Sequence, residues 1–592
     1  MSVENEKKSS AIMGKLCDIE RSHTATPYVS AICGAYVLML AQHCQGAVEL
    51  KDILEQAEQP KRLVSYLMSK LADHWQEYTP LLTVYTEDEL CEFLSTIDFT
   101  GQFGFKGGAE SSAPICNLVY EILNPQKGEE VCDLGCCLGD YLRGLYQYMG
   151  ENSRETTFVG YDINPDFAAI ADIRLRCAGI DVEIVWDDFF KTSYASKKFD
   201  KVFSNPPMCL SMRDTTQVAD FIRSAFPDFP EIPTSVSSAD WLFVARAAAA
   251  MKKGGKAVVV LPASAMMVKQ AEPYRRYFLQ RNMIESVIEL PDRLFAYTGI
   301  STFILVLGEG VESVRMIKAN GMCERGRRNN LITPDNAREI AAMTRAQLPD
   351  GSENLAFVKK DDLIADESNL TVLRHFADPV VVRDGVPFGS LVDSARRGAP
   401  IGSKELDELM CDKDTGIFYI STGNINDGII DRELMKLRKL PDGMQSFCAK
   451  NGDLLVSRVM AKGAAFKVAV VELDEGVSLL PNGNLLVITV DREIADPYFV
   501  KAYLETEYAQ KYMLNASVGN TVRTLQYKNL EQLPVPRLPL ARQREIGNRC
   551  RAAVHNVIQA MSQLETSRRA LCNVFNESAA DCFVETTNPN RE

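Results

Sequence analysis

Long apolar runs and an apolar N-terminal leader are the first features that this sequence lacks. A membrane-spanning helix needs roughly 18 consecutive apolar residues, and the nearest approach, Tyr28–Ala41, is interrupted by Ser30 and Gly34. The N-terminus, MSVENEKKSS, is largely polar and does not resemble a secretion signal. We therefore expect a cytoplasmic protein without a membrane partner.

Metal-binding and disulfide patterns are absent as well. Sixteen cysteines are spread along the chain, but none forms a CxxC pair and only five histidines accompany them, so we expect no bound metal. Cys136 and Cys137 are adjacent and poorly suited to pairing elsewhere. These features favour a reducing compartment, with a disulfide-stapled secreted protein as the alternative.

The sequence also lacks a net positive charge. Its formal net charge is −14 and its pI about 5.2, which excludes a globally basic nucleic-acid-binding protein but leaves room for a local basic groove. With 592 residues, the chain is too long for one ordinary core, so we expect three or four domains.

The pattern of apolar residues changes along the N-terminal half. Residues 1–95 have helical spacing and predict a helical N-terminal domain. In residues 96–310, short apolar runs alternate with helix-like segments, which predicts a doubly wound, Rossmann-like α/β domain with seven strands. Residues 311–380 are more polar and are interpreted as a closing segment and linker. The predicted strands are Val131–Leu134, Thr157–Tyr161, Val182–Val185, Lys201–Ser204, Ala257–Leu261, Ile284–Glu289 and Thr302–Leu307.

The pattern of apolar and turn-forming residues is different in the C-terminal part. Turn signals such as Asn426-Asp427-Gly428 separate β-rich runs in residues 381–540, which predicts an α+β module. Residues 541–592 begin with a predicted long helix, Ala541–Asn573, and end in a tail. The helix has a near-heptad apolar stripe, which favours dimerisation or packing against its own chain: Ile546, Cys550, Ala553, Val557, Met561, Leu564 and Leu571.

The first predicted strand runs into a glycine-containing turn. Asp133 lies near the end of the strand, and Gly135 and Gly139 follow before the next helix. Glycines after a strand-end acid let the backbone approach a small-molecule cofactor. The alternative is an ordinary tight turn.

Acidic residues also end the next two strands. Asp162 could accept hydrogen bonds from both ribose hydroxyls of a nucleoside, or it could be an ordinary N-cap of the helix that Asn164-Pro165 announces. Asp188 could bond an adenine amino group while Phe189 packs on the ring. A solvated loop acid is the alternative for Asp188.

The fourth strand leads into the most informative motif, Asn205-Pro206-Pro207-Met208. Two prolines fix φ and remove N–H donors, which leaves the Asn205 side-chain oxygen and the Pro206 carbonyl as rigid acceptors. An amino group held by two acceptors directs its lone pair at an electrophile. The motif therefore favours methyl transfer to an exocyclic amine.

These four motifs, in this order, resemble the modification subunits of type I restriction-modification systems, which methylate adenine N6 in DNA with S-adenosylmethionine. The likeness covers residues 100–310 and implies a cofactor site at Asp133, Gly135, Gly139, Asp162 and Asp188. It implies that the extruded adenine binds at Asn205-Pro206-Pro207, with Met208 lining its pocket. Further matching stretches are Ser238–Phe243, Met251–Pro262, Tyr274–Tyr277, Val287–Pro291 and Phe295–Thr302.

Three positions depart from that family. Met208 stands where the family has an aromatic residue that stacks on the adenine, and methionine has no π-face. Cys137 replaces a glycine of the turn, and Ser112-Ala113-Pro114 replaces an aromatic-Thr-Pro sequence. A catalytically degenerate homologue that acts as a sequence-specific DNA-binding or assembly subunit is therefore the alternative function.

Residues 384–575 resemble one half of a type I specificity subunit, a target-recognition domain followed by a spacer helix. Residues 431–470 contain eight Lys and Arg but only four Asp and Glu, which gives this stretch a local positive charge. Its basic side chains could contact DNA phosphates. The alternative is a solvated basic face. The matching stretches are Val386–Asp393, Tyr419–Gly428, Gly452–Ser457, Gly519–Leu525 and Leu533–Gln543.

Together the two resemblances imply a site-specific DNA adenine methyltransferase that binds duplex DNA and pairs with a second copy through its C-terminal helix. One recognition module would read one half-site, and two would read a symmetric, interrupted site. No P-loop motor motif is present, so cleavage would need a separate restriction subunit. A methyltransferase acting on a protein glutamine amide and a subunit that mainly binds other proteins remain as alternatives.

Overall fold

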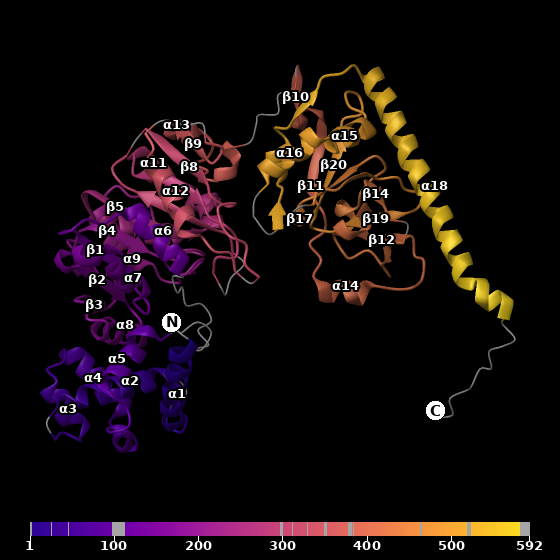
Figure 1. Cartoon of the computed structure of the whole chain (residues 1–592). Helices are drawn as coiled ribbons and strands as arrows, with labels where there is room; N and C mark the ends of the chain where they lie inside the picture. The colour runs from indigo at the N-terminus through magenta and orange to yellow at the C-terminus, as the bar shows by residue number, and fades with distance from the viewer. Residues whose placement is uncertain are drawn as a thin grey trace. The chain divides into compact units, whose positions relative to one another are not determined.

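The structure, a computed structural model, describes residues 3–24, 27–44, 46–97, 113–295, 300–310, 312–327, 329–347, 352–376, 382, 384–431, 433–461, 464–517 and 522–579. Two units make up the chain, Met1–Phe376 and Ala377–Glu592 (Figure 1). Within the described residues no helix combines the length and the apolar character that crossing a membrane requires.

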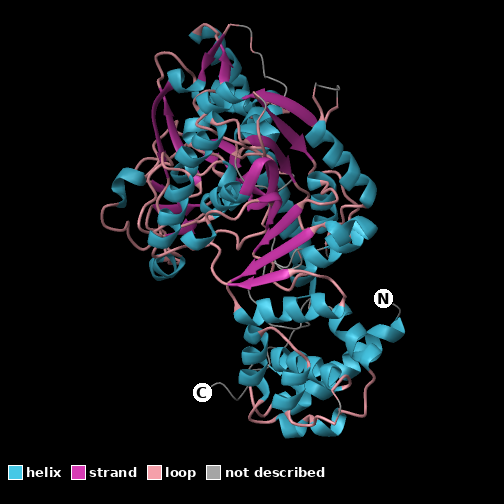
Figure 2. Ribbon diagram, turned by 90° about the vertical axis from the view of Figure 1, so that its left-hand side faces the viewer, coloured by secondary structure: helices cyan, strands magenta, loops and turns pink. Residues whose placement is uncertain are grey.

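The first unit begins with helices, as the apolar spacing predicts. They are α1 (Val3–Glu20), α2 (Pro27–Ala41), α3 (Leu50–Gln56), α4 (Lys61–Leu71) and α5 (Glu87–Thr96), and they form the helical bundle at the bottom of Figure 2. Their apolar faces share one buried cluster with Ala168, Ile170 and Ile173 of α8 (Pro165–Cys177). The N-terminal helices therefore pack directly on the α/β part.

The described residues of this unit form a nine-stranded sheet with the order β3-β2-β1-β4-β5-β7-β6-β8-β9. Only β7 and β9 run antiparallel to their neighbours. Chain order reverses between β1 and β4, and open α/β sheets bind ligands at such a switch point, beyond the carboxyl ends of the strands. The strands are β1 (Glu130–Leu134), β2 (Thr157–Asp162), β3 (Glu183–Trp186), β4 (Phe199–Ser204), β5 (Met251–Pro262), β6 (Ile284–Glu289), β7 (Thr302–Leu307), β8 (Ser313–Lys318) and β9 (Leu355–Lys359).

Helices cover both faces of the sheet. Cys132 and Val202 face a cluster with α9 (Thr216–Ala225), α10 (Asp240–Ala250) and α11 (Glu272–Gln280). Val131 and Phe203 face the opposite cluster, built with α6 (Ala113–Leu123), α7 (Asp140–Met149) and α12 (Pro334–Arg345). Alternate side chains thus enter two cores, as strands require, and the α/β fold class is confirmed.

The prediction of seven strands is wrong in number, because β8 and β9 extend the sheet. The segment interpreted as a closing segment and linker contributes both strands, together with α12 and α13 (Lys360–Ala365). The sequence of β8, Ser-Val-Arg-Met-Ile-Lys, hides the strand because a buried Arg315 interrupts the apolar run. Its guanidinium donates to the carbonyl of Ala346 at 2.6 Å, which makes its burial tolerable.

The second unit combines small sheets with short helices, in line with the predicted α+β texture. Its larger sheet has the order β11-β20-β16-β18, and it ends in α18 (Leu540–Ala579), the long helix of Figure 1. Its other principal elements are β10 (Gly385–Pro387), β12 (Ile417–Ile420), β19 (Ser478–Pro481), β22 (Pro534–Pro536), α14 (Ser403–Leu409), α15 (Pro497–Leu504) and α16 (Glu507–Ala516). The sheet strands are β11 (Val392–Arg397), β16 (Leu454–Ser457), β18 (Val468–Val470) and β20 (Leu485–Val490).

Candidate active site

The carboxyl ends of β1 and β4 lie next to each other at the switch point. In the parallel register Asp133 stands opposite Phe203, and the Ser204 hydroxyl donates a 2.9 Å hydrogen bond to the Leu134 carbonyl. On the other side of β1, Leu134 pairs with Tyr161 of β2. The glycine turn after β1 and the Asn-Pro-Pro motif after β4 therefore begin side by side.

The two glycines of the turn serve different needs. Both have positive φ, +89° at Gly135 and +79° at Gly139, a region that glycine enters without steric cost. A Cβ at Gly135 would meet no described atom within 4 Å, whereas a Cβ at Gly139 would lie 3.1 Å from Leu175 Cδ1. Gly135 thus leaves open space in front of the turn, and Gly139 lets α7 begin close to α8.

Asp133 is a buried carboxyl at the end of β1. It is 2% exposed, and its Oδ1 has no hydrogen-bond partner among the described residues. Burial, and to a smaller extent the charge of Asp162, raise the pKa of Asp133 well above its ordinary value. A buried unpaired acceptor costs roughly 1–3 kcal/mol, so this position favours a ligand that donates a hydrogen bond.

Asp162, at the end of β2, braces the glycine turn. Its Oδ2 accepts a 2.9 Å hydrogen bond from the N–H of Cys137, and its Oδ1 accepts one of 2.8 Å from the N–H of Asn164. The N-cap of α8 is Asn164, whose side chain accepts from the N–H of Asp166. Asp162 is thus not the cap, and the second lone pair of each of its oxygens remains suited to a ligand hydroxyl.

Asp188 and Phe189 form the loop after β3. Asp188 Oδ1 accepts from the N–H of Phe190 at 2.9 Å, and Oδ2 accepts from Gln217 Nε2 at 3.1 Å. Phe189 is partly buried, and its carbonyl accepts a 2.8 Å hydrogen bond from Nε of Arg246. The carboxylate of Asp188 is therefore held in a fixed orientation rather than solvated freely.

The Asn-Pro-Pro motif begins with two buried residues and reaches the surface at its third. Asn205 is 4% exposed and its side-chain oxygen is buried, Pro206 is buried, and Pro207 is exposed. Met208 is partly buried against the cluster on the α6, α7 and α12 face. Cys209 then turns the chain with φ of +54°. The motif thus carries its acceptors at the buried edge and opens outward at Pro207.

The comparison with protein-family models concerns this part of the chain. Residues 110–381 match the family model for N-6 DNA methylases. These residues belong to the N-6 DNA methylase family. This methylase domain holds every residue that the sequence predicts for the cofactor and the target base.

Two of the similar proteins described here are subunits of type I systems, and the third is a type IIG enzyme. The chain is 24% identical over 327 residues to the type I restriction enzyme MpnII methylase subunit of Mycoplasma pneumoniae, an alignment covering 49% of this chain and 60% of that relative's length. A solved methyltransferase subunit of a type I restriction-modification system from Streptococcus thermophilus is 15% identical, with a TM-score of 0.48, covering 62% of this chain and 98% of that one. The type IIG restriction endonuclease BpuSI is 14% identical, with a TM-score of 0.46, covering 92% and 74%.

Helix α10 of the methylase domain supplies two residues that the sequence reasoning missed. Asp240, 3% exposed, accepts the N–H of Cys209 on Oδ1 at 3.1 Å and the hydroxyl of Ser238 on Oδ2 at 2.6 Å. Arg246, six residues further along, donates to the loop after β3. The segment Ser238–Phe243 belongs to the family resemblance, but only the fold shows that Asp240 holds Cys209 and Ser238.

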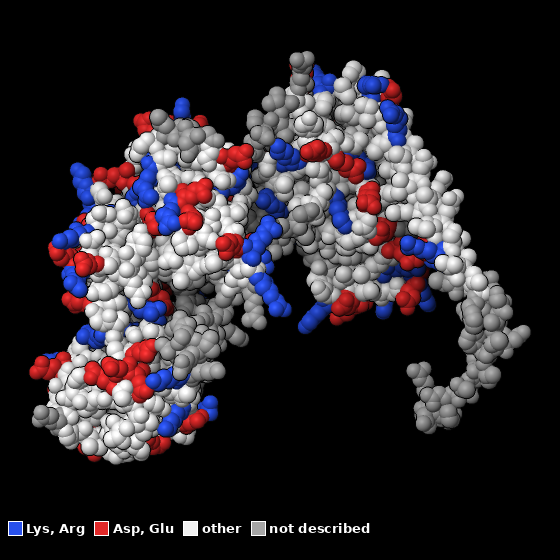
Figure 3. All heavy atoms as spheres, in the orientation of Figure 1, with Lys and Arg blue, Asp and Glu red and all other residues white. Residues whose placement is uncertain are grey.

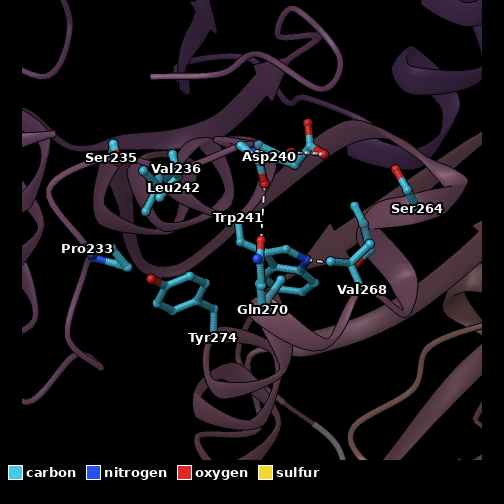
Figure 4. A pocket seen from close by; sticks show the side chains of 14 residues that line it. Pro233, Ser235, Val236, Asp240, Trp241, Leu242, Ser264, Val268, Gln270 and Tyr274 are labelled. Carbon is cyan, nitrogen blue, oxygen red and sulfur yellow. Dashed lines mark hydrogen bonds between the residues drawn. The ribbon is translucent and has the colours of Figure 1, made fainter. Parts of the chain in front are cut away.

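A cavity of about 410 Å³ adjoins this end of α10 in the methylase domain (Figure 4). Trp241 and Tyr274 form its apolar wall, and Gln270 accepts a 3.1 Å hydrogen bond from the Ser237 hydroxyl across it. Asp240 connects the cavity to the backbone of Cys209. Residues 205–208 are not among its lining residues, so the cavity neighbours the Asn-Pro-Pro motif without containing it.

Some predicted positions lie outside the described residues. They include Ser112 of the Ser-Ala-Pro sequence, residues 296–299 of the segment after β6, and residues 518–521 of the recognition module. Arg432 and Lys462 of the basic run lie outside them too.

Two basic residues of the second unit hold its own fold. Lys467 Nζ donates to the carbonyl of Thr422 at 3.0 Å, and Arg458 donates to the carbonyl of Gly483 at 3.0 Å. On the face in Figure 3, Lys and Arg stand among Asp and Glu over both units. At least these two of the eight basic residues counted in the sequence therefore have a structural role within the unit.

The apolar stripe of α18 divides into two parts. Near its start, Ile546 packs against the core of the second unit, and further along Arg551 and His555 both donate to Glu472, at 2.7 and 2.8 Å. Beyond that point the stripe is exposed, from 42% at Val557 to 74% at Leu571. The intramolecular interpretation thus holds for the first part only.

Proposed function

We propose that the methylase domain transfers a methyl group from S-adenosylmethionine to N6 of adenine in duplex DNA, as part of a type I-like restriction-modification system. The single observation that carries this proposal is the hydrogen bond from Ser204 to the Leu134 carbonyl, which places the glycine turn beside the Asn-Pro-Pro motif. A cofactor held by the first and an amine held by the second would meet at one edge of the sheet.

The residues present fit S-adenosylmethionine. Open space in front of Gly135 accommodates a ligand close to the backbone, and the unpaired Oδ1 of Asp133 suits a hydrogen-bond donor of the ligand. Asp162 would receive ribose hydroxyls on its remaining lone pairs, while Asp188 and Phe189 would hold the adenine ring of the cofactor. When bound, the cofactor supplies an electrophilic methyl group.

The Asn-Pro-Pro residues act on the substrate amine. The Asn205 side-chain oxygen and the Pro206 carbonyl would accept its two hydrogens, which aims the nitrogen lone pair at the methyl group. N6 gains the methyl and releases one proton to solvent, so no strong base is needed. The buried position of Asn205 excludes water from competing for its oxygen.

DNA would reach this site with its target base extruded, because N6 is inaccessible within the helix. Met208 would line the pocket of that base. Residues 381–540 would act as the target-recognition domain for one half-site, and a second copy paired through α18 would supply the other. Cleavage of unmodified DNA would belong to a separate motor and nuclease subunit.

A DNA-binding homologue without activity is the second candidate, and one observation favours it. Cys137 adopts a φ of +49° in the glycine turn, where the family has a glycine. Its Cβ would narrow the space in which a cofactor approaches the backbone. Both candidates bind DNA, but only the first transfers methyl groups.

The decisive experiment measures transfer of labelled methyl groups to duplex DNA of random sequence, with the wild-type chain and an Asn205→Ala variant. Incorporation as N6-methyladenine by the wild type, reduced at least 100-fold in the variant, supports the proposal. Retention of DNA without incorporation supports the second candidate. Labelling of added protein instead of DNA would overturn both.

A further inference from the structure

Arg246 is a buried arginine whose charge has little visible compensation. It is 1% exposed, and its one assigned hydrogen bond runs from Nε to the carbonyl of Phe189 at 2.8 Å. Its Nη1 and Nη2 have no hydrogen-bond partner in the described part of the chain. The guanidinium lies instead over aromatic rings, 4.7 Å from the centroid of Phe221 and 5.8 Å from that of Phe189.

Arg275, another buried arginine of the same unit, has more hydrogen bonds than Arg246. Arg275 donates to the carbonyls of Ser368, Ala265 and Val268, and is equally buried at 1%. Burial of a charge without full hydrogen bonding costs stability, and apolar residues of similar volume often replace such groups at no loss. With two buried N–H groups unpaired among the described residues, Arg246 is less well compensated than Arg275. This difference directs attention to what its one hydrogen bond fixes.

That hydrogen bond fixes a single peptide unit. The Phe189 carbonyl, which Arg246 holds, belongs to the same planar peptide as the N–H of Phe190. This N–H donates to Oδ1 of Asp188 at 2.9 Å. Fixing the carbonyl on one side of a trans peptide fixes the direction of the N–H on the other, and a charged donor on the carbonyl also polarises the N–H. Arg246 thus sets the orientation of the Asp188 carboxylate through one rigid unit.

We infer that Arg246 is a positioning residue that aims Asp188 at the exocyclic amine of the cofactor's adenine. The inference rests on the proposed function, in which Asp188 and Phe189 hold that ring. Arg246 contacts neither cofactor nor DNA in this scheme, and its effect appears in the selectivity for adenine over a purine that lacks the amine.

The test compares affinities for S-adenosylhomocysteine and for its deaminated analogue, S-inosylhomocysteine, by calorimetry on the full chain. The wild type should prefer the adenine compound. In Arg246→Met the affinity for the adenine compound should fall about tenfold, the effect of roughly one charge-assisted hydrogen bond, while the inosine compound changes less than about threefold. The melting temperature should stay equal or rise, because an uncompensated buried charge is removed.

Arg275→Met is the matched control, since it removes an equally buried guanidinium with three hydrogen bonds. It should lower the melting temperature and leave the selectivity unchanged. If the Arg246→Met protein does not fold, Arg246→Gln takes its place with the same criterion. Unchanged selectivity in the Arg246 variant, or none in the wild type, overturns the inference. Binding of neither compound by the wild type counts against the proposed function itself.

Discussion

The backbone N–H of Cys137 lies 2.9 Å from Oδ2 of Asp162, and this hydrogen bond joins the turn after β1 to the end of β2. Asp162, which the sequence places at the end of the second strand, therefore has a structural role of its own, because it holds the turn after β1. This contact helps to hold Cys137, a non-glycine residue, at a φ of +49°. The same residue pair thus connects the cofactor site to its most evident departure from the family.

Replacing Cys137 tests the cost of that conformation. Because L-residues other than glycine lose roughly 1–2 kcal/mol in the left-handed region, Cys137→Gly should unfold with about 1 kcal/mol more free energy than Cys137→Ala. Both variants lack the thiol, so their difference isolates the backbone. Urea denaturation measures it, and equal stabilities would contradict the strain.

Asp133 should make stability depend on pH. Since its pKa is raised in the folded state, the folded chain keeps a proton that the unfolded chain loses above about pH 4. The free energy of unfolding should therefore fall as pH rises from about 4 toward the raised pKa, by up to about 1.4 kcal/mol per pH unit. Asp133→Asn should remove this slope and be the more stable protein at neutral pH. A slope unchanged in the variant would refute the assignment.

Met208→Phe should improve the pocket for the extruded base. Stacking of a base on an aromatic ring is worth roughly 1–3 kcal/mol, and Met208 is only partly buried, so a ring has room to turn outward. We expect roughly tenfold faster methyl transfer to the target adenine, measured with labelled cofactor. Met208→Leu, which adds no ring, should not show this gain.

Asp240→Ala should affect catalysis more than cofactor binding. The substitution frees the N–H of Cys209, which directly follows Met208, and leaves the loops after β1, β2 and β3 unaltered. Loss of a charge-assisted hydrogen bond predicts roughly a tenfold drop in kcat, with affinity for S-adenosylhomocysteine within about twofold of the wild type. A parallel loss of cofactor affinity would place Asp240 elsewhere in the mechanism.

The exposed part of the α18 stripe predicts self-association. Met561→Glu combined with Leu564→Glu should weaken the dimer at least about tenfold, because burying each such side chain contributes roughly 1.5–3 kcal/mol. Sedimentation velocity would show a shift toward the monomer. Gln559→Glu adds a charge on the opposite side of the helix and should leave the dimer intact. A wild type that is monomeric at all concentrations would exclude this role.

Local patterns carried much of the fold and the candidate site. Strands Ile284–Glu289 and Thr302–Leu307 coincide with their predictions, because short apolar or alternating runs indicate strands directly. The order Asp133, Asp162, Asp188, Asn205 along the chain placed all four at strand ends. Where a buried arginine broke the apolar run, as in β8, the local pattern failed.

What the sequence determined by itself is the chemistry at each strand end, since acid, glycine and proline act through their own backbone and side chains. The tertiary structure alone decided which distant groups hold those ends. Arg246 reaches Phe189 across 57 positions and Asp240 reaches Cys209 across 31, and no periodicity records such pairs. Only the packing of α10 against β4 and β5 brings these residue pairs together. A hydrogen bond needs its two atoms within about 3 Å of each other, whereas a sequence pattern indicates only which face of an element is buried.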